Sequence, residues 1–252
     1  MLSHQVTSKL QTLRLSGMLQ ALEEQNSMPN INQLSFDERF GLIIDREDIE
    51  RRNKSFNNRL KKGKLKENAN IEELDFNPKR SISKTTILKF ISCDWIKGHQ
   101  NIIVTGSTGA GKTYMSCALA QAACRQGYTI MYLRIPRFLR TLEVARADGS
   151  YDKLLKDLQK TDLILFDDFG QAKLQTEEAR DLLEIMDDRH ATRSCIITSQ
   201  LDSTKWYDLI PDPTIADALL DRIIHRSHKI DIKGPSMRKE RSALTADNKS
   251  TK

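Results

Sequence analysis

The first third of the chain repeats apolar residues at helical spacing. Over residues 4–25, leucines and a methionine return at steps of three and four residues, which predicts one amphipathic helix. Ser35 and Glu38 match the capping-box pattern, so a second helix is expected to begin there and to end near Gly63. A further short helical turn is expected over residues 70–76. These elements predict a small all-α N-terminal domain.

The rest of the chain alternates short apolar runs with amphipathic stretches. After a helix expected over residues 81–91, this alternation is typical of a parallel sheet with crossover helices. Strands are expected at residues 101–105, 129–133, 162–167, 195–199 and 229–232, and helices at 111–126, 136–147, 151–159, 176–190 and 213–225. The prediction is therefore an α/β fold, a three-layer α/β/α domain around a central parallel sheet, over residues 79–241. The helical domain precedes it over residues 1–78, and residues 242–252 are expected to form a polar, disordered tail.

A glycine-rich loop follows the first expected strand. Its sequence is Gly106-Ser107-Thr108-Gly109-Ala110-Gly111-Lys112-Thr113, which matches the P-loop pattern G-x-x-x-x-G-K-[ST]. Glycines let backbone amides curve around phosphate oxygens, and the helix that begins there adds the positive end of its dipole. In such a loop the lysine reaches the β- and γ-phosphates and the threonine hydroxyl binds Mg²⁺. A nucleotide site is favoured over an ordinary glycine-rich turn, with Tyr114 beside it.

An apolar run from Leu163 to Phe166 ends in two carboxylates, Asp167 and Asp168. A central parallel strand is buried on both faces, and its carboxyl end faces the crevice where ligands bind. Placed after a P-loop, the run is a Walker B pattern. Asp167 is then expected in the Mg²⁺ shell, and Asp168 is expected to orient or deprotonate the attacking water. Without the P-loop, the same run would often be only a strand entering a turn.

The strand expected at residues 195–199 ends in polar residues beside the site. Ser199 or Gln200 could supply an uncharged hydrogen-bonding group near the γ-phosphate, and the sequence does not decide between them. The alternative is a polar strand end that makes only ordinary turn hydrogen bonds.

Length and composition narrow the class of protein. The chain has 252 residues, and no apolar stretch approaches the roughly 20 residues of a membrane span. Residues 1–10 lack the apolar core of a signal peptide. The four cysteines are scattered, which indicates reduced packing thiols. A cytoplasmic protein with no membrane partner is therefore expected.

The net charge of +6 is concentrated in blocks. Residues 37–50 carry six acidic and two basic side chains, whereas residues 51–66 carry eight basic ones and no acid, including Arg51, Arg52, Lys61 and Lys62. Such a block suits a polyanion such as nucleic acid, and the alternative is a solvated helix face.

Taken together, these motifs resemble the AAA+ ATPase group that contains DnaC and IstB, and IstB more closely. DnaC-type proteins load the replicative helicase, and IstB is the helper ATPase of a bacterial insertion-sequence family. The resemblance extends over about residues 5–241. It is carried by residues 106–113, 163–168, 196–200, 221–222 and 234–238, and by the N-terminal segments 13–19, 36–40 and 76–78.

The resemblance implies roles for individual residues. ATP would bind residues 106–113 with Mg²⁺ at Thr113 and Asp167, and Asp168 would be the catalytic carboxylate. Arg222 would act in trans on the nucleotide of a neighbouring subunit, although a surface salt bridge with Asp217 or Asp221 is its alternative. Arg238 is a candidate for a phosphate-binding arginine of the same chain.

Two departures from the family pattern matter for the chemistry. Asp168 stands where AAA+ proteins commonly have glutamate, so its shorter side chain predicts slow hydrolysis. Gln200 stands where many relatives carry asparagine, which leaves the choice between Ser199 and Gln200 open.

In this group, a helix inserted after the second strand lines a DNA channel. The corresponding residues here include Arg137 and Arg140, three apart on one helical face, and Lys173 lies just beyond the Walker B turn. Each could equally be a solvated surface charge. No base-reading motif is present, so the expected contacts are with the DNA backbone.

The function expected from these features is an ATPase that oligomerises on duplex DNA, with ATP between subunits, and delivers or activates a transposase. One alternative is a DnaC-like helicase loader, which binding to helicase rather than to duplex DNA would indicate. The other is a monomeric P-loop kinase or nucleotide-regulated binding module. For the latter, an Arg222→Ala change would leave turnover untouched.

Overall fold

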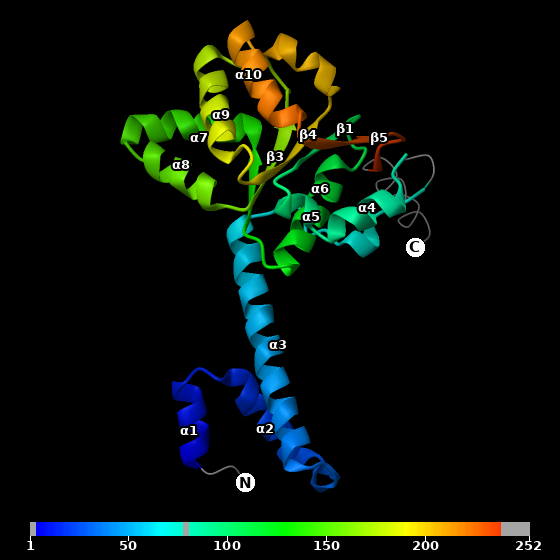
Figure 1. Cartoon of the computed structure of the whole chain (residues 1–252), viewed down its shortest axis with the longest axis vertical. Helices are drawn as coiled ribbons and strands as arrows, with labels where there is room; N and C mark the ends of the chain where they lie inside the picture. The colour runs from blue at the N-terminus through cyan, green and yellow to red at the C-terminus, as the bar shows by residue number, and fades with distance from the viewer. Residues whose placement is uncertain (1–3, 78–80, 238–252) are drawn as a thin grey trace, which may run out of the picture. The chain divides into compact units, whose positions relative to one another are not determined.

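The computed structural model describes residues 4–77 and 81–237 and divides into two compact units, Met1–Asn58 and Arg59–Lys252 (Figure 1). The expected C-terminal tail, residues 242–252, lies outside the described residues.

The first unit is helical. Its elements are α1 (His4–Thr12), α2 (Ser16–Ser27), the 3-10 turn η1 (Ile31–Gln33) and the first part of α3 (Phe36–Gly63). The capping box at the start of α3 is confirmed, because the Ser35 amide donates to Glu38 at 2.8 Å and the Glu38 amide donates to Ser35 Oγ at 3.3 Å.

The single helix expected over residues 4–25 is wrong. The chain turns between α1 and α2 at Arg14, whose φ is +58°. The step of only two residues from Leu13 to Leu15 does not fit one helical face, and Leu13 is 64% exposed. Two short helices therefore replace one long helix.

The second unit is built on a five-stranded sheet, ordered β2-β3-β4-β1-β5, and every strand pair is parallel. The strands are β1 (Asn101–Gly106), β2 (Ile130–Arg134), β3 (Leu163–Phe169), β4 (Ser194–Ser199) and β5 (Ser227–Ile232). All five strands lie where the sequence predicts them. The predicted α/β class with a central parallel sheet is confirmed.

Helices cover both faces of this sheet (Figure 1). They are α4 (Lys84–Ile91), α5 (Asp94–Lys97), α6 (Lys112–Arg125), α7 (Ile135–Asp148), α8 (Tyr151–Lys160), α9 (Thr176–Arg189) and α10 (Pro213–Ile224), with 3-10 turns η2 (Ile71–Glu73), η4 (Ser203–Lys205) and η5 (Tyr207–Leu209). The sequence predicts each of these α-helices except the single turn of α5. The start of α4 is set by Ser83, whose Oγ accepts a hydrogen bond from the Thr86 amide.

Alternation along the strands decides which side chains face which helices. Ile103, Phe166 and Ile197 belong to the apolar cluster formed with α7, α8, α9 and α10. Their neighbours in sequence point to the opposite face, where α6 packs against β1, β2, β3 and β4. Residues that share a face with Leu163 and Leu165, including Asp167, are therefore directed toward α6.

The expected domain boundary at Asn77-Pro78 differs from the division between the two units, which falls after Asn58 within α3. The reason is that residues 59–77 pack onto the second unit. A Cβ added to Gly63 would lie 2.4 Å from Ile130 Cγ1, and Ala69 is fully buried. The sequence in this stretch is polar and carries no pattern that marks this packing.

Candidate nucleotide-binding site

The glycine-rich loop between β1 and α6 has a backbone conformation that requires glycine. Gly106, Gly109 and Gly111 have φ values of +145°, +82° and +100°, which side chains with a Cβ rarely adopt. Space is also limited, because a Cβ at Gly109 would lie 2.1 Å from Ser236 Oγ and one at Gly106 would lie 2.3 Å from the Ile232 carbonyl oxygen. The loop therefore needs glycine at these positions for both conformation and packing.

Lys112 is held at the mouth of the loop. Its Nζ donates to the Gly106 and Ser107 carbonyl oxygens at 2.8 and 2.9 Å, and the residue is 7% exposed. Because Lys112 is also the first residue of α6, its charge and the helix dipole act at the same place. This loop is suited to hold an anionic phosphate chain.

Asp167 is fully buried and receives three side-chain hydrogen bonds. Thr113 and Thr198 donate to its Oδ1 at 2.9 and 2.6 Å, and Tyr132 donates to its Oδ2 at 2.7 Å. Burial, together with the hydrogen bond to Asp167, raises the pKa of Tyr132 far above its usual value, so this hydroxyl stays a donor. A carboxylate and a hydroxyl at this spacing are the hard oxygen ligands that Mg²⁺ prefers.

Thr198 and Tyr132 were not among the predicted site residues. Both could have been found from strand alternation, since Thr198 shares the α6-side face with Ile196, and Tyr132 pairs with Leu165 across the sheet. Among the described residues, no group of three His, Cys, Asp or Glu side chains could hold a metal ion by itself. This fits Mg²⁺ sites, in which water and phosphate oxygens complete the shell around few protein ligands.

Asp168 lies beside Asp167 with a different environment. Its φ is +64°, and its carboxylate accepts a hydrogen bond from Arg134 Nε at 2.7 Å. Its amide donates to Thr198 Oγ1 at 3.1 Å. The side chain of Asp168 is 17% exposed, whereas that of Asp167 is not exposed at all. Arg134, which ends β2, was not predicted as a site residue.

The structure distinguishes Ser199 from Gln200. Ser199 is fully buried, and its hydroxyl donates to the Phe169 carbonyl oxygen at 2.8 Å and accepts from the Leu201 amide at 3.1 Å. Gln200 instead lines the cavity, and its Oε1 accepts from Thr108 of the loop at 2.8 Å. Only Gln200 is placed to contact a ligand.

These groups surround a cavity of about 370 Å³, within the range of small-molecule sites. Its lining includes predicted residues (Thr108, Gly109, Gly111, Lys112, Thr113, Tyr114, Asp168 and Gln200) and unpredicted ones (Lys66, Glu67, Arg134, Gln171 and Met237). Lys66 belongs to the basic block that was expected to bind nucleic acid. Nothing in the spacing of residues 51–66 separates it from the other basic residues.

Arg222 does not line this cavity. Its guanidinium donates to Asp187 of α9 and to the Ala218 carbonyl oxygen, and it lies 3.7 Å from Asp221. Asn101, at the first residue of β1, donates to the Arg222 carbonyl oxygen at 3.4 Å. Arg222 therefore lies near the amino ends of the strands, whereas the cavity lies at their carboxyl ends. Arg238 lies outside the described residues.

The candidate DNA-binding residues fall into two groups. Arg137, Arg140 and Lys173 are exposed, and none of the three makes an ion pair with a described residue. Arg51 and Arg52 instead pair with Glu47 and Asp48, one turn earlier on α3, at 2.6 and 2.8 Å. Lys61 and Lys62 are exposed in the last turn of the same helix.

The four cysteines are free and buried, which agrees with the packing role expected for them. No helix in the described part of the chain has the length and apolar character needed to cross a bilayer.

Comparison with known proteins identifies a family and individual relatives with similar sequences. A family model described as IstB-like ATP binding protein matches residues 8–245. An insertion sequence ATP-binding protein of Sinorhizobium fredii is 40% identical over 239 residues, which cover 95% of this chain and 98% of the relative. The insertion sequence IS1162 ATP-binding protein of Pseudomonas fluorescens is 45% identical over 205 residues, which cover 81% of this chain and 89% of the relative.

Solved structures share the fold at lower identity. The crystal structure of DnaI matches with a TM-score of 0.58 and 19% identity, covering 66% of this chain and 92% of that one. The DnaC helicase loader matches with a TM-score of 0.54 and 18% identity, covering 66% of this chain and 97% of that one.

Proposed function

The chain belongs to the family of IstB-like ATP-binding proteins, and we propose that it is an ATP-dependent helper of DNA transposition. It would assemble on duplex target DNA and there recruit or activate a transposase. The observation that carries the proposal is a cavity lined by Lys112 and Thr113 of the P-loop and by Asp168, with Asp167 hydrogen-bonded to Thr113 beside it, in a chain whose relatives are ATP-binding proteins of insertion sequences. Those relatives favour transposition over the loading of a replicative helicase.

ATP would bind with its phosphates in the glycine-rich loop. Lys112 would exchange its two carbonyl partners for β- and γ-phosphate oxygens, and the amides of the loop would complete the cradle. Thr113 and Asp167 would hold Mg²⁺, which neutralises charge on the phosphate oxygens when it is bound. The hydrogen bonds from Thr198 and Tyr132 keep the Asp167 carboxylate in one orientation for this task.

Hydrolysis would use Asp168 as the group that orients the attacking water and draws its proton as the oxygen bonds to the γ-phosphorus. The bond between the β- and γ-phosphates breaks, and ADP leaves. Arg134 holds the carboxylate of Asp168 from the end of β2. Gln200 would contact the γ-phosphate or the water from the neighbouring strand end. The short side chain of Asp168 is the reason to expect slow turnover.

Arg222 would complete the site of a neighbouring copy. It lies away from the cavity of its own chain, and its side chain is 32% exposed, so an approaching subunit can reach it. In that role it would exchange Asp187 for the γ-phosphate of the neighbour, which makes assembly depend on ATP. Hydrolysis would remove that contact and weaken the assembly.

DNA contact would come first from Arg137, Arg140 and Lys173, three exposed cations that have no ion-pair partner among the described residues. Because such contacts go to phosphates, binding would be insensitive to sequence and sensitive to salt. The basic end of α3, with Lys61 and Lys62, would add further charge, and Arg51 and Arg52 would contribute less because each already pairs with a carboxylate.

The experiment that tests this proposal measures particle size with a duplex present and with ATP, ADP or no nucleotide. We expect large complexes on DNA with ATP only, and their loss in Lys112→Ala and Arg222→Ala. Arg180→Ala is the matched control, because Arg180 is an exposed arginine whose one ion pair with a described residue is to Glu177 on its own helix. A particle of monomer size under every condition would contradict the proposal and favour a monomeric nucleotide-binding module.

A further inference from the structure

Residues 64–76, here called the linking segment, follow α3 and lie along α6, the helix that begins at the P-loop. Asn70 accepts hydrogen bonds from Gln121 and Arg125 of α6, at 2.8 and 3.0 Å. Glu73 accepts one from the Tyr114 hydroxyl at 2.5 Å. The linking segment is thus attached to both ends of the nucleotide-binding helix.

The first part of the linking segment reaches the cavity itself. Lys66 and Glu67 line it, opposite the loop that carries Lys112. Lys66 Nζ lies 4.0 Å from Asp167 Oδ2, and the Lys66 side chain is 38% exposed, so its flexible stem can move within the cavity. Two ammonium groups from separate parts of the chain therefore face one cavity.

Asp167 cannot keep Lys66 as a partner once a divalent cation binds to it. The cation and the ammonium would compete for the same carboxylate, and like charges at this distance repel. The anionic groups left within the cavity are then Glu67, Asp168, which already pairs with Arg134, and a bound chain of phosphates. A polyphosphate held by the loop carries more negative charge than one carboxylate, so it is the stronger attractor.

We propose that Lys66 is a second phosphate-binding lysine of the nucleotide site, supplied by the linking segment, and that bound ATP clamps this segment onto α6. The inference rests on the proposed binding of ATP at the P-loop and deepens it. It assigns Lys66 to the nucleotide instead of to DNA, and it makes the docking of residues 64–76, already held through Asn70 and Glu73, tighter when the ligand is bound.

Cys117 reports on whether the linking segment is docked. It lies on α6 and is fully buried, and the backbone amides of Glu67 and Lys66 in the linking segment act to lower the pKa of its thiol. Burial raises the pKa of this thiol to about 11, against the opposing effect of those amides, so little reactive thiolate forms while the segment covers it. Lifting the segment would expose the sulfur to an alkylating reagent.

The first test measures affinity for a fluorescent ATP analogue in the presence of Mg²⁺. Lys66→Gln is expected to weaken binding about tenfold, the effect of losing one charge-assisted hydrogen bond in a partly exposed site. Lys64→Gln is the matched control, since Lys64 lies in the same segment and does not line the cavity. Thermal melting of each variant without nucleotide checks that the fold is kept.

The second test measures alkylation of Cys117 by N-ethylmaleimide, resolved by peptide mass spectrometry, with and without ATP. ATP should slow the reaction severalfold in the wild type and in Lys64→Gln, and should have no effect in Lys66→Gln at equal site occupancy. Cys195 in the sheet serves as the internal reference.

The outcomes separate this inference from the proposed function. If the wild type does not bind ATP, the proposed function fails and the inference fails with it. If the wild type binds ATP but Lys66→Gln binds equally well and protects Cys117 equally well, the inference alone is overturned.

Discussion

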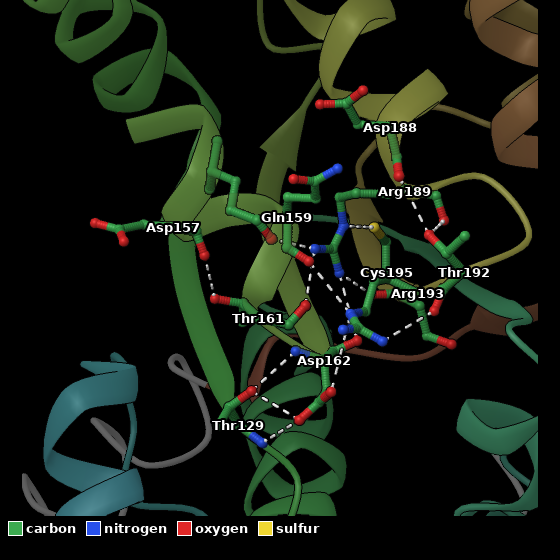
Figure 2. A network of polar contacts seen from close by, with 12 residues as sticks. Thr129, Asp157, Gln159, Thr161, Asp162, Asp188, Arg189, Thr192, Arg193 and Cys195 are labelled. Atoms are coloured by element: carbon green, nitrogen blue, oxygen red, sulfur yellow. Dashed lines mark hydrogen bonds and ion pairs between the residues drawn. The ribbon is translucent and has the colours of Figure 1, made fainter. Parts of the chain in front are cut away.

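Arg189 shows how single residues hold the sheet together away from the nucleotide cavity. This arginine is 1% exposed, and its guanidinium donates to the carbonyl oxygens of Leu158, Thr161, Asp162 and Ser194, at 2.5 to 3.4 Å (Figure 2). Those carbonyls lie at the end of α8 and at the starts of β3 and β4, so one side chain satisfies backbone acceptors of three elements. A buried charge of this kind is tolerated only because its donors are used.

Replacing Arg189 with methionine should lower the free energy of unfolding by about 3 kcal/mol, because several buried carbonyls lose their donor. Urea unfolding of the full chain measures the change. Arg193 is the control, since it lies in the same network but its side chain is 36% exposed, and Arg193→Met should cost less than about 1 kcal/mol. Equal losses in the two variants would mean that burial of the guanidinium does not matter.

Substitutions at the neighbouring residues Ser199 and Gln200 should affect different properties, stability at Ser199 and catalysis at Gln200. Gln200→Ala removes a group that lines the cavity, so it should lower steady-state phosphate release about tenfold with little change in melting temperature. Ser199→Ala leaves the Phe169 carbonyl and the Leu201 amide without their partner, which should cost about 1–2 kcal/mol of stability. The reverse pattern would assign the sensing role to Ser199.

At the scale of elements, the crossing of α2 and α3 depends on one glycine and one glutamate. A Cβ on Gly17 would lie 2.7 Å from Glu47 Cα, so the two helix backbones approach more closely than any side chain permits. Glu47 is 6% exposed, and its carboxylate accepts from the amides of Gly17 and Met18 at 2.8 and 3.1 Å. The start of α2 is thus capped by a residue of another helix, since Leu15 offers no side-chain cap.

Gly17→Ala should destabilise the first unit by about 1–3 kcal/mol, because the added methyl group forces α2 away from α3. Gly41→Ala is the matched control in α3, where a Cβ would meet nothing within 4 Å. That change should stabilise the helix by up to about 1 kcal/mol, as alanine normally does relative to glycine. Amide hydrogen exchange in α2 and α3 of the full chain measures both effects, and a stabilising Gly17→Ala would refute the close crossing.

At the scale of the whole molecule, the net charge of +6 says less about binding to a polyanion than the number of basic side chains that have no other partner. Arg51 and Arg52 are paired within α3, and Lys66 lies in the nucleotide cavity. Arg137 and Arg140 point outward from α7, whose buried face carries Phe138, Leu139 and Leu142. The positive charge left for a polyanion is therefore concentrated on fewer residues than the sequence count suggests.

Replacing Arg137 and Arg140 together with alanine should weaken binding to duplex DNA and reduce the slope of log affinity against log salt by about 2, close to one for each phosphate that these arginines neutralise. Fluorescence anisotropy with a labelled duplex, between about 50 and 200 mM salt, gives this slope. The control is the Arg51→Ala and Arg52→Ala pair, which should change the slope less because both residues have carboxylate partners. An unchanged slope in the first variant would exclude α7 from the DNA interface.

The sequence by itself determined the order of strands and helices in the second unit and the central residues of the candidate nucleotide-binding site. Strand and helix periods are local properties, and the glycine-rich loop requires particular residues at a fixed spacing, so residues 106–113, Asp167 and Asp168 could be predicted. The tertiary structure decided what depends on contacts between distant segments. Arg134, Tyr132 and Thr198 join the site only because β2, β3 and β4 lie side by side, and the choice of Gln200 over Ser199 depends on which side chain the cavity reaches. Lys66 is the clearest case. It lies in a run of basic residues, and nothing in the neighbouring sequence indicates that it folds beside Asp167, a carboxylate far along the chain.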